Sequence, residues 1–341
     1  MTRRPFETNW GERERDAAMT AGGDRCLEAV RRINSRGGSA PHLALSFDCH
    51  LFSIDTSRAP KACVQPDAYL ITHAHSDHYG KSAMLSPRAV ASVQTARALE
   101  IRYDREYKGR TFRVGESIIV DGVRVDTHST GHTIGSTAFS WQTEAGLRVL
   151  VTGDVKDYSH LPKSDFLVME ANYGDPYDPS CIFEDDLAGF SEALEAGASF
   201  GAYAFGKAQR AVALMRAMGY RDEIGMDEKS LVLTRELMGE AAGPLTEVNG
   251  ADTNVVTPWN LHQVRGWNKY FLTGRRDTSY PTIQLSDHLD FRGLMRMVEH
   301  VSPKEVLVYH PEGERASLLA HHLQECGLET TSLDLIERFV R

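Results

Sequence analysis

The sequence predicts an α/β chain: a sandwich of two β-sheets flanked by helices, with a second domain inserted before the chain returns to the first. Three features of the pattern predict this class. Short apolar segments separated by tight turns occupy residues 43–152, as in a sheet-forming region. Helical spacing of apolar residues begins at residue 183. The C-terminal part then alternates strand and helix, which is typical of layered α/β folds.

The N-terminal region is predicted to be a surface helix. Residues 11–36 are rich in charge and carry Leu27, Val30 and Ile33 at helical spacing, and two glycines follow directly.

Tight turns separate the predicted strands of the first region. Asp121-Gly122 and Ala145-Gly146 each lie between two apolar runs, and the first dipeptide strongly favours a two-residue hairpin turn. The predicted strands are Ala68–Ile71, Ser117–Val120, Val123–Thr127, Thr137–Gln142, Leu147–Thr152 and Phe166–Glu170.

Helices and strands share the rest of the chain, and residues 239–254 are polar and rich in turns. The predicted helices are Glu184–Glu195, Lys207–Met218, Phe291–Val301 and Glu314–Cys326, and the strands are Leu231–Leu233, Thr282–Leu285 and Glu305–Tyr309.

Bulk composition narrows the class of protein. The 341 residues are 41% hydrophobic and 25% charged, which is ordinary for a globular chain. The apolar runs are too short to cross a bilayer and residues 1–6 lack a secretory signal, so we expect a cytoplasmic protein without membrane contact. The net charge of −9 argues against a broad basic surface for duplex nucleic acid, although a metal cluster can make one groove positive. The five scattered cysteines are expected to be reduced thiols.

The run Thr72–Tyr79, which reads T-H-A-H-S-D-H-Y, concentrates metal-ligand side chains. His73 and His75 are two residues apart after a predicted strand, so they share a face. The chain then turns and brings Asp77 and His78 back to the same point. Imidazoles with a carboxylate form a ligand set for zinc or a similar divalent metal. Four such groups indicate two metals, because one tetrahedral ion could hardly take all four and keep an open position.

Three further segments offer ligands at strand ends. His132 lies in a glycine-framed loop, Asp154 follows an apolar strand, and His310 ends another. Each alone is better explained by a solvated or buried histidine or by an ordinary turn. Together with the first run they complete a two-metal set.

These motifs resemble the metallo-β-lactamase superfamily. The H-x-H-x-D-H run, the later G-H-x-x-G-S and the T-G-D are similar to its pattern, and the superfamily fold is an αββα sandwich with metals at the sheet edges. Three further segments resemble the β-CASP nucleases: residues 166–174 with an acidic residue, 202–210 with glycine, a basic residue, Ala and Gln, and 285–290 with S-x-H-x-D. The likeness extends from about residue 45 to the C-terminus.

The resemblance divides the chain into four segments. They are an N-terminal helical extension (1–40), the first part of a metallo-β-lactamase domain (41–183), a β-CASP-like inserted α/β domain (184–281) and the C-terminal return of the first domain (282–341).

The resemblance also implies the metal ligands. The first metal would be held by His73, His75 and His132, and the second by Asp77, His78 and His310, with Asp154 bridging the two. Two Zn²⁺ ions are expected, with Mn²⁺ as the alternative. Their charge exceeds that of the two aspartates, which suits a phosphodiester and its more negative transition state. A hydroxide shared between the ions would serve as the nucleophile at neutral pH.

Catalytic roles follow from the same resemblance. His288 would act as the general acid or orient the substrate, with Glu170 as its carboxylate partner, and Asp77 is counted with them. A helix start carrying Lys207 and Arg210 is either a phosphate site or a plain turn with solvated cations.

The implied function is a nuclease acting on single-stranded nucleic acid. His310 is typical of the RNA-directed branch, whereas the K-A-Q-R and L-S-D-H-x-D segments look like short prokaryotic members described as DNA-ligase-associated exonucleases or as homologues of the mRNA 3′-end processing nuclease. Pro311 departs from the usual H-G-E. The choice of DNA or RNA, repair or RNA-processing partners, and a homodimer are left open.

Two other functions stay open. One is hydrolysis of a thioester or lactone on the same fold, which would need neither Glu170 with His288 nor the inserted domain. The other is a non-catalytic subunit that binds nucleic acid, although such relatives usually lose ligands. Tyr103, Trp259 and Trp267 could stack on bases, but burial or an ordinary surface position explains each more simply, so no role is assigned to them.

Overall fold

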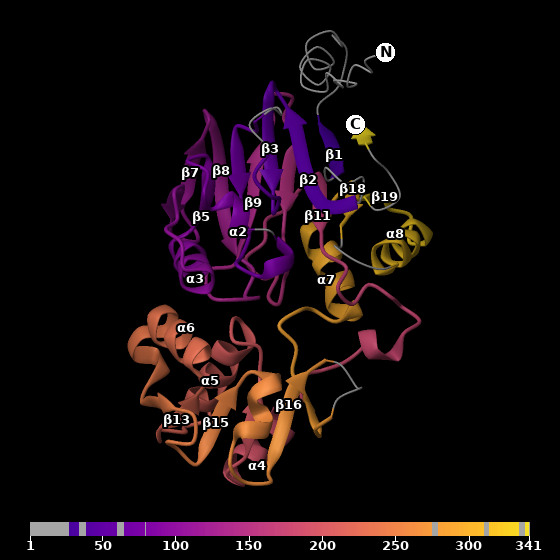
Figure 1. Ribbon diagram of the computed structural model, residues 1–341. Helices are drawn as coiled ribbons and strands as arrows, with labels where there is room; N and C mark the ends of the chain where they lie inside the picture. The colour runs from indigo at the N-terminus through magenta and orange to yellow at the C-terminus, as the bar shows by residue number, and fades with distance from the viewer. Residues whose placement is uncertain are drawn as a thin grey trace, which may run out of the picture.

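The chain folds into two bodies, one above the other in Figure 1, which confirms the α/β class. The larger body holds two seven-stranded sheets and the smaller a six-stranded sheet. This computed structural model describes residues 27–33, 39–59, 65–78, 80–274, 279–309, 314–333 and 338–340.

Neighbouring strands are hydrogen-bonded in the following spatial order. The first sheet contains β20 (Arg338–Val340), β1 (Glu28–Ile33), β2 (Ser39–Phe47), β3 (His50–Ile54), β4 (Ala68–Leu70), β5 (Ala89–Ser92) and β6 (Arg110–Phe112). The second contains β19 (Glu329–Ser332), β18 (Glu305–Val308), β11 (Phe166–Met169), β10 (Arg148–Val151), β9 (Thr137–Gln142), β8 (Val123–Ser129) and β7 (Ser117–Val120). The third contains β14 (Leu245–Glu247), β13 (Ile224–Met226), β15 (Thr253–Val256), β12 (Ser199–Gly201), β16 (Lys269–Thr273) and β17 (Thr282–Gln284).

The helices cover these sheets or join their strands. The α-helices are α2 (Gly80–Ala83), α3 (Val93–Tyr103), α4 (Leu187–Glu195), α5 (Lys207–Ala217), α6 (Glu228–Met238), α7 (Phe291–Val301) and α8 (Arg315–Glu325). The 3-10 helices are η1 (Ser76–His78), η2 (Pro179–Cys181), η3 (Gly239–Ala242) and η4 (Pro258–Gln263).

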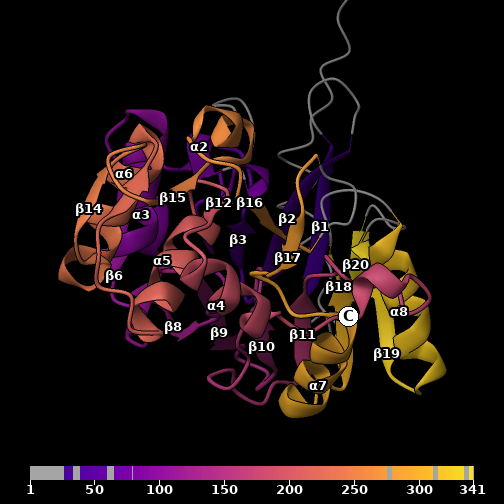
Figure 2. The ribbon, with the colours of Figure 1, turned by 90° about the horizontal axis from the view of Figure 1, so that it is seen from below.

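The two large sheets bury apolar side chains between them because successive residues of a strand point to opposite faces. Val149 and Val151 of β10 lie in this central core with Phe52 of β3. Leu150 points the other way, into a second core shared with Leu294 of α7. Helices α2 and α3 cover the outer face of the first sheet, and α7 and α8 that of the second, as Figure 2 shows.

The third sheet is parallel in all its pairings and is packed against α4 and α5. The chain leaves the larger body after β11 and returns with α7, and β18 then pairs with β11 in parallel. The smaller body is therefore an excursion between two neighbouring strands. β17 pairs with β16 and so lies in the third sheet, although the sequence placed residues 282–284 with the C-terminal return. The predicted boundaries at 183/184 and 281/282 stay predictions.

The two bodies share a buried contact. Phe205 and Leu233 of the smaller body pack with Tyr69 and Leu99 of the larger. Such a shared core fixes the edge of the smaller body against the larger one.

Two predicted elements are wrong. The helix expected over residues 11–36 is a strand at Glu28–Ile33, because the backbone of β1 pairs with β2 on one side and β20 on the other. Residues 11–26 lie outside the described part of the chain. The strand expected at Leu231–Leu233 belongs to helix α6, whose N-cap Asp227 accepts from the backbone of Ser230. The other predicted strands and helices form, with ends shifted by a few residues at most.

Within the described residues, the structure contains no helix with the length and apolar character needed to cross a membrane.

Asp165 contacts residues at the beginnings of three neighbouring strands of the second sheet, β10, β11 and β18. Its carboxylate accepts from Arg148 Nε at 2.8 Å and lies 3.0 Å from Lys304 Nζ. Its backbone carbonyl accepts from Lys304 and Glu305. Hydrogen bonds from Arg148, with help from Lys304, hold the pKa of this carboxyl below its usual value although burial opposes them.

Asp165→Asn should lower the thermal midpoint of unfolding at neutral pH by a few degrees, because it removes the charge that both cations bind. A carboxyl with a lowered folded-state pKa contributes stability above its unfolded pKa, about 3.9, and that contribution is lost as the pH falls toward the folded value. The difference between wild type and variant should therefore shrink below about pH 4. Thermal unfolding followed by circular dichroism checks this, with Asp222→Asn as the exposed control. A difference that stays constant down to the lowest accessible pH would contradict it.

Candidate metal centre

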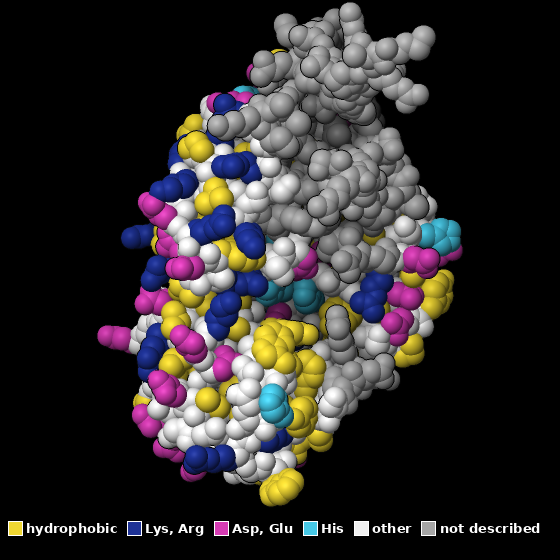
Figure 3. Space-filling view, viewed as in Figure 1, with side chains coloured by type: hydrophobic (Ala, Val, Ile, Leu, Met, Phe, Trp, Pro, Cys, Tyr) yellow, Lys and Arg dark blue, Asp and Glu magenta, His cyan; other side chains and the backbone are white. Residues whose placement is uncertain are grey.

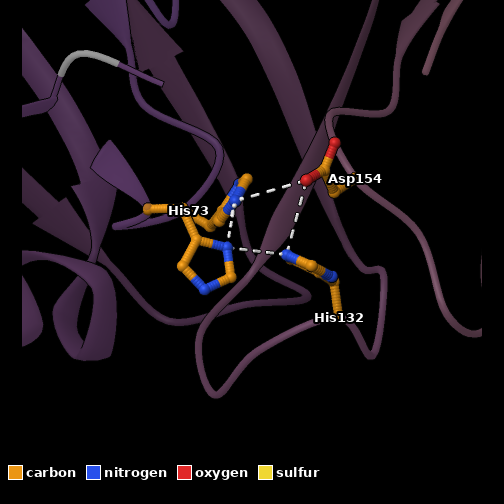
Figure 4. Close-up of side chains that lie close together, drawn as sticks. His73, His132 and Asp154 are labelled. Carbon is orange, nitrogen blue, oxygen red and sulfur yellow. Dashed lines mark hydrogen bonds and ion pairs between the residues drawn. The ribbon is translucent and has the colours of Figure 1, made fainter. Parts of the chain in front are cut away.

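The predicted ligands gather where several strands of the larger body end. His73 and His75 follow β4, His132 lies in the loop after β8, and Asp154 follows β10. One ligand atom from each lies within 4.8 Å of the others. Figure 4 shows His73, His132 and Asp154 pointing toward one another. The first predicted ligand set, including the proposed bridging carboxylate, is therefore brought together.

Three ring nitrogens face each other at close range. His75 Nδ1 lies 3.0 Å from both His73 Nε2 and His132 Nε2. Asp154 Oδ2 lies 3.6 Å from His73 Nε2 and 3.4 Å from His132 Nε2. Four donors around a tetrahedral ion with bonds of about 2.0–2.1 Å would be roughly 3.3 Å apart. The spacing thus matches a single divalent cation.

The outer nitrogens of two of these rings determine their protonation. His75 Nε2 donates to the carbonyl of Phe205 at 3.2 Å, and His132 Nδ1 donates to that of Asp287 at 2.8 Å. A carbonyl only accepts, so the proton of each neutral ring sits on its outer nitrogen. The inner nitrogens then carry lone pairs that face each other.

Two consecutive hydrogen bonds fix the orientation of the third ring, that of His73. The single hydroxyl proton of Thr72 is donated to Asp55 Oδ2 at 2.6 Å, so Thr72 Oγ1 accepts from His73 Nδ1 at 3.0 Å. His73 Nε2 is consequently also bare. Three lone pairs at such short separations repel each other unless a cation lies among them, which is the observation that favours a metal here.

Burial keeps these rings neutral. It lowers the pKa of His73 and of His132 well below the usual value, with the neighbouring histidines adding to the effect. Burial also lowers the pKa of His75 to about 4, and Arg102 contributes to this shift. A metal binds neutral imidazole, so no proton has to leave these rings near neutral pH.

A second group adjoins the first. His78 Nε2 lies 3.4 Å from Asp154 Oδ2, and its Nδ1 donates to Asp55 Oδ2 at 2.7 Å. Burial alone would lower the pKa of His78, but the carboxylates of Asp154 and Asp55 outweigh it and raise the pKa. Asp55 therefore orients one histidine directly and another through Thr72.

Close backbone approach makes a glycine necessary at this edge. Gly153 has φ +59°, and a Cβ there would lie 2.6 Å from the Cβ of Thr72. The glycine of the T-G-D motif thus lets the chain after β10 pass close to Thr72, so that Asp154 lies next to the histidines that follow Thr72.

Two predicted ligands are not placed in these groups. Asp77 lies exposed on η1, and its carboxylate joins none of the candidate groups found among the described residues. His310 lies outside the described residues. Its chain neighbour Tyr309 lines a cavity together with His78 and Asp154.

The predicted catalytic pair lies beside this cluster. His288 Nδ1 is 3.1 Å from Glu170 Oε2 and 3.8 Å from Asp154 Oδ2. Glu170 also accepts from the amide of Asn172 at 2.7 Å and from the backbone of Val155 at 2.5 Å. Burial would lower the pKa of His288, yet the charges of Glu170 and Asp154 raise it. Glu170 is thus held rigidly as a partner for the imidazole.

Lys207 and Arg210, for which the sequence left open a phosphate site or solvated cations, are both near carboxylates. Lys207 Nζ donates to the carbonyl of Leu285 at 2.9 Å and lies 3.7 Å from Asp287. Arg210 Nη2 lies 2.6 Å from Asp185, which also binds Lys156 at 2.7 Å. These contacts hold the loop that carries His288.

The sequence pattern did not single out Asp55 or Asn172. Asp55 follows the buried strand β3, at φ +48°, just as Asp154 follows β10. An acidic residue directly after an apolar strand was the available signal. Asn172 lies two residues after Glu170, and nothing in the pattern marks its amide as a donor to that carboxylate.

Comparisons with known proteins agree with this geometry. Residues 64–195 match the metallo-beta-lactamase superfamily model. Over 299 residues the chain is 25% identical to a probable DNA ligase of Opitutus terrae; the match covers 77% of this chain and 28% of that protein. The chain thus spans under a third of that relative's length.

A solved structure shares the fold. The crystal structure of a protein of unknown function from Enterococcus faecalis V583 aligns with 93% of this chain and 100% of its own, with a TM-score of 0.65 at 11% identity. Residues 64–195, which match the metallo-β-lactamase superfamily model, contain His73, His75, His132 and Asp154, a cluster suited to a metal.

Proposed function

We propose that this metallo-β-lactamase superfamily hydrolase is a nuclease that cleaves phosphodiester bonds of single-stranded nucleic acid with two divalent metal ions, Zn²⁺ or Mn²⁺. The observation that carries the proposal is the His288–Glu170 pair at 3.1 Å, beside the cluster that contains Asp154. A displaced alkoxide leaving group needs a proton, and an imidazole held by a carboxylate can donate one. The name of the relative, a probable DNA ligase, favours DNA over RNA and an association with strand joining.

Some residues of the site would bind the metal ions, and others would transfer a proton. His73, His75 and His132 would hold one ion, and His78 with Asp77 and His310 the other, with Asp154 between them. When bound, such ions lower the pKa of water toward neutrality and offset phosphate charge. His288 would protonate the leaving oxygen, and Glu170 would keep its ring in place. The smaller body supplies the loop that carries His288.

His73→Ala and Asp154→Asn should each reduce cleavage of end-labelled single-stranded DNA by at least about 100-fold, because each removes a donor to the ion. Wild type should produce a ladder from one labelled end if it is an exonuclease and internal fragments if it is an endonuclease. The same preparations are assayed on RNA and on a thioester, with Zn²⁺ or Mn²⁺ and with a chelator. Thioester hydrolysis without any phosphodiester cleavage would refute the proposal.

His288→Ala should lower kcat on the oligonucleotide by about 10²- to 10⁴-fold, as expected for loss of a general acid. Its metal content, measured by elemental analysis, should equal that of wild type, since His288 is not among the proposed ligands. Glu170→Gln should give a smaller loss, because the ring keeps a neutral partner. The exposed His321→Ala is the matched control and should retain full activity. Full activity of the His288 variant would remove it from the mechanism.

Asp55→Asn should weaken metal binding by about 10- to 100-fold, the usual effect of losing the partner that orients ligands. Asparagine tolerates the left-handed backbone of this position, so the fold should persist. Titration of metal-free protein with Zn²⁺, read by calorimetry, measures the change. Asp121→Asn is the control, since this residue also has positive φ and contacts a histidine, but at the surface. Equal affinities of the two variants would show that the relay through Asp55 does not matter.

A further inference from the structure

Three aromatic side chains gather on the smaller body. Tyr203 is 41% exposed and Trp259 62% exposed, and their ring centroids are 6.3 Å apart. The ring of Phe271 lies 6.1 Å from that of Tyr203, at an interplanar angle of 74°. We call these three residues the aromatic platform.

The fold builds this platform from segments distant in sequence. Tyr203 follows β12, Trp259 lies in η4 after β15, and Phe271 lies in β16. A Cβ at Gly201 would lie 3.4 Å from Pro258 Cα, so the glycine lets η4 close over the end of β12. This close approach places two large rings side by side at the surface.

The exposure of the platform points to a ligand. Single exposed aromatics are common, but contiguous exposed rings usually mark a binding surface. In Figure 3, hydrophobic side chains lie directly below the histidines that reach the surface in the middle of this face.

The platform is close to the metal centre along the chain. Tyr203 precedes Phe205 by two residues, and the carbonyl of Phe205 accepts from His75 Nε2 at 3.2 Å. Two residues span at most about 7 Å. A planar group stacked on Tyr203 would therefore lie only a short step from the proposed reaction centre.

Two cations lie close to the buried ring of Phe205 and the neighbouring ring of Tyr103. Arg102 Cζ lies 5.5 Å from the Phe205 ring and 5.6 Å from that of Tyr103. Exposed Lys81 holds its Nζ 5.4 Å above the Tyr103 ring. The ring of Phe205 is buried and that of Tyr103 half-buried, so these two cations bring positive charge to the neighbourhood of the exposed platform and not to its rings. Stacking for bases and positive charge for phosphates are the two elements that bind a single strand.

We propose that the aromatic platform stacks the bases of a single nucleic-acid strand and so delivers its backbone to the metal centre, with Arg102 and Lys81 facing the phosphates. This inference rests on the proposed nuclease function and names the part of the substrate that the smaller body holds. Duplex nucleic acid is disfavoured as the occupant, because its bases are already stacked and paired.

Binding of a fluorescently labelled single-stranded oligonucleotide, measured by anisotropy with a chelator present, tests the platform without catalysis. Trp259→Ala should raise Kd by about 5- to 100-fold, and Trp259→Phe by much less, because phenylalanine can still stack. Trp267→Ala is the matched control, since this tryptophan on the same body is 101% exposed, and its Kd should equal that of wild type. An oligonucleotide with abasic sites should bind wild type as weakly as the intact one binds Trp259→Ala.

Hydrolysis of bis(p-nitrophenyl) phosphate separates the two proposals, because this small diester carries no nucleobase. Trp259→Ala should lose much less of this activity than of its oligonucleotide cleavage, and the control Trp267→Ala should hydrolyse the diester at the wild-type rate. Equal Kd values for the Trp259 and Trp267 alanine variants, tight binding of the abasic strand, or equal affinity for duplex would overturn the platform. Absence of phosphodiester cleavage by wild type would instead overturn the nuclease function, while the binding experiment would still decide the platform.

Discussion

The close approach of three unprotonated ring nitrogens is the constraint on which the rest of this structure depends. His75 Nδ1 lies 3.0 Å from the Nε2 atoms of His73 and His132, and lone pairs at that distance repel. A hydrogen bond from outside fixes the orientation of each ring, and a cation among the lone pairs would remove their repulsion. Two of those bonds end on carbonyls of Phe205 and Asp287, which belong to the excursion between β11 and β18. The metal centre is thus a joint product of both bodies.

Ion pairs between the two bodies also hold the loop beside the candidate metal centre in place. Arg210 and Lys156 share Asp185, and Lys207 approaches Asp287, so cations that sequence alone offered to a phosphate are engaged with protein carboxylates. Partly buried pairs of this kind are costly to break, because one charge would be left without its partner. They fix the loop that ends in His288. Positive charge for a substrate would then come from the proposed metal ions and from cations nearer the surface.

The sequence could point to His73, His75, His132 and Asp154, which the structure brings together, because the signals for these residues are local. Alternation places His73 and His75 on one face, and the later histidine and aspartate each follow a recognisable strand. The relay through Asp55 could not be predicted, since a carboxylate 17 residues from Thr72 is joined to it only by the fold.

Secondary structure was mispredicted where pairing or capping outweighed the local pattern. Leu27, Val30 and Ile33 have helical spacing, yet two neighbouring strands pair with the backbone of this segment, and pairing of this kind overrides propensity. In the apolar run Leu231–Leu233, the strand prediction ignored the N-cap at Asp227. A three-residue apolar run fits either structure, so the cap decides.

The segment from Tyr203 to Gly206 connects the aromatic platform to the candidate metal centre. At one end its tyrosine belongs to the exposed aromatic platform, and at the other Gly206, at φ +87°, lies so close that a Cβ would sit 3.3 Å from His75 Nε2. Between them Phe205 packs into the larger body, and its carbonyl accepts from the proton-bearing nitrogen of the same histidine. At most three residues of the chain separate the platform from the groups that contact the metal ligand His75. A displacement of the platform would therefore also change the orientation of this histidine. A ligand that prefers the ordered position of this segment would, by linkage, also favour the arrangement that holds the metal.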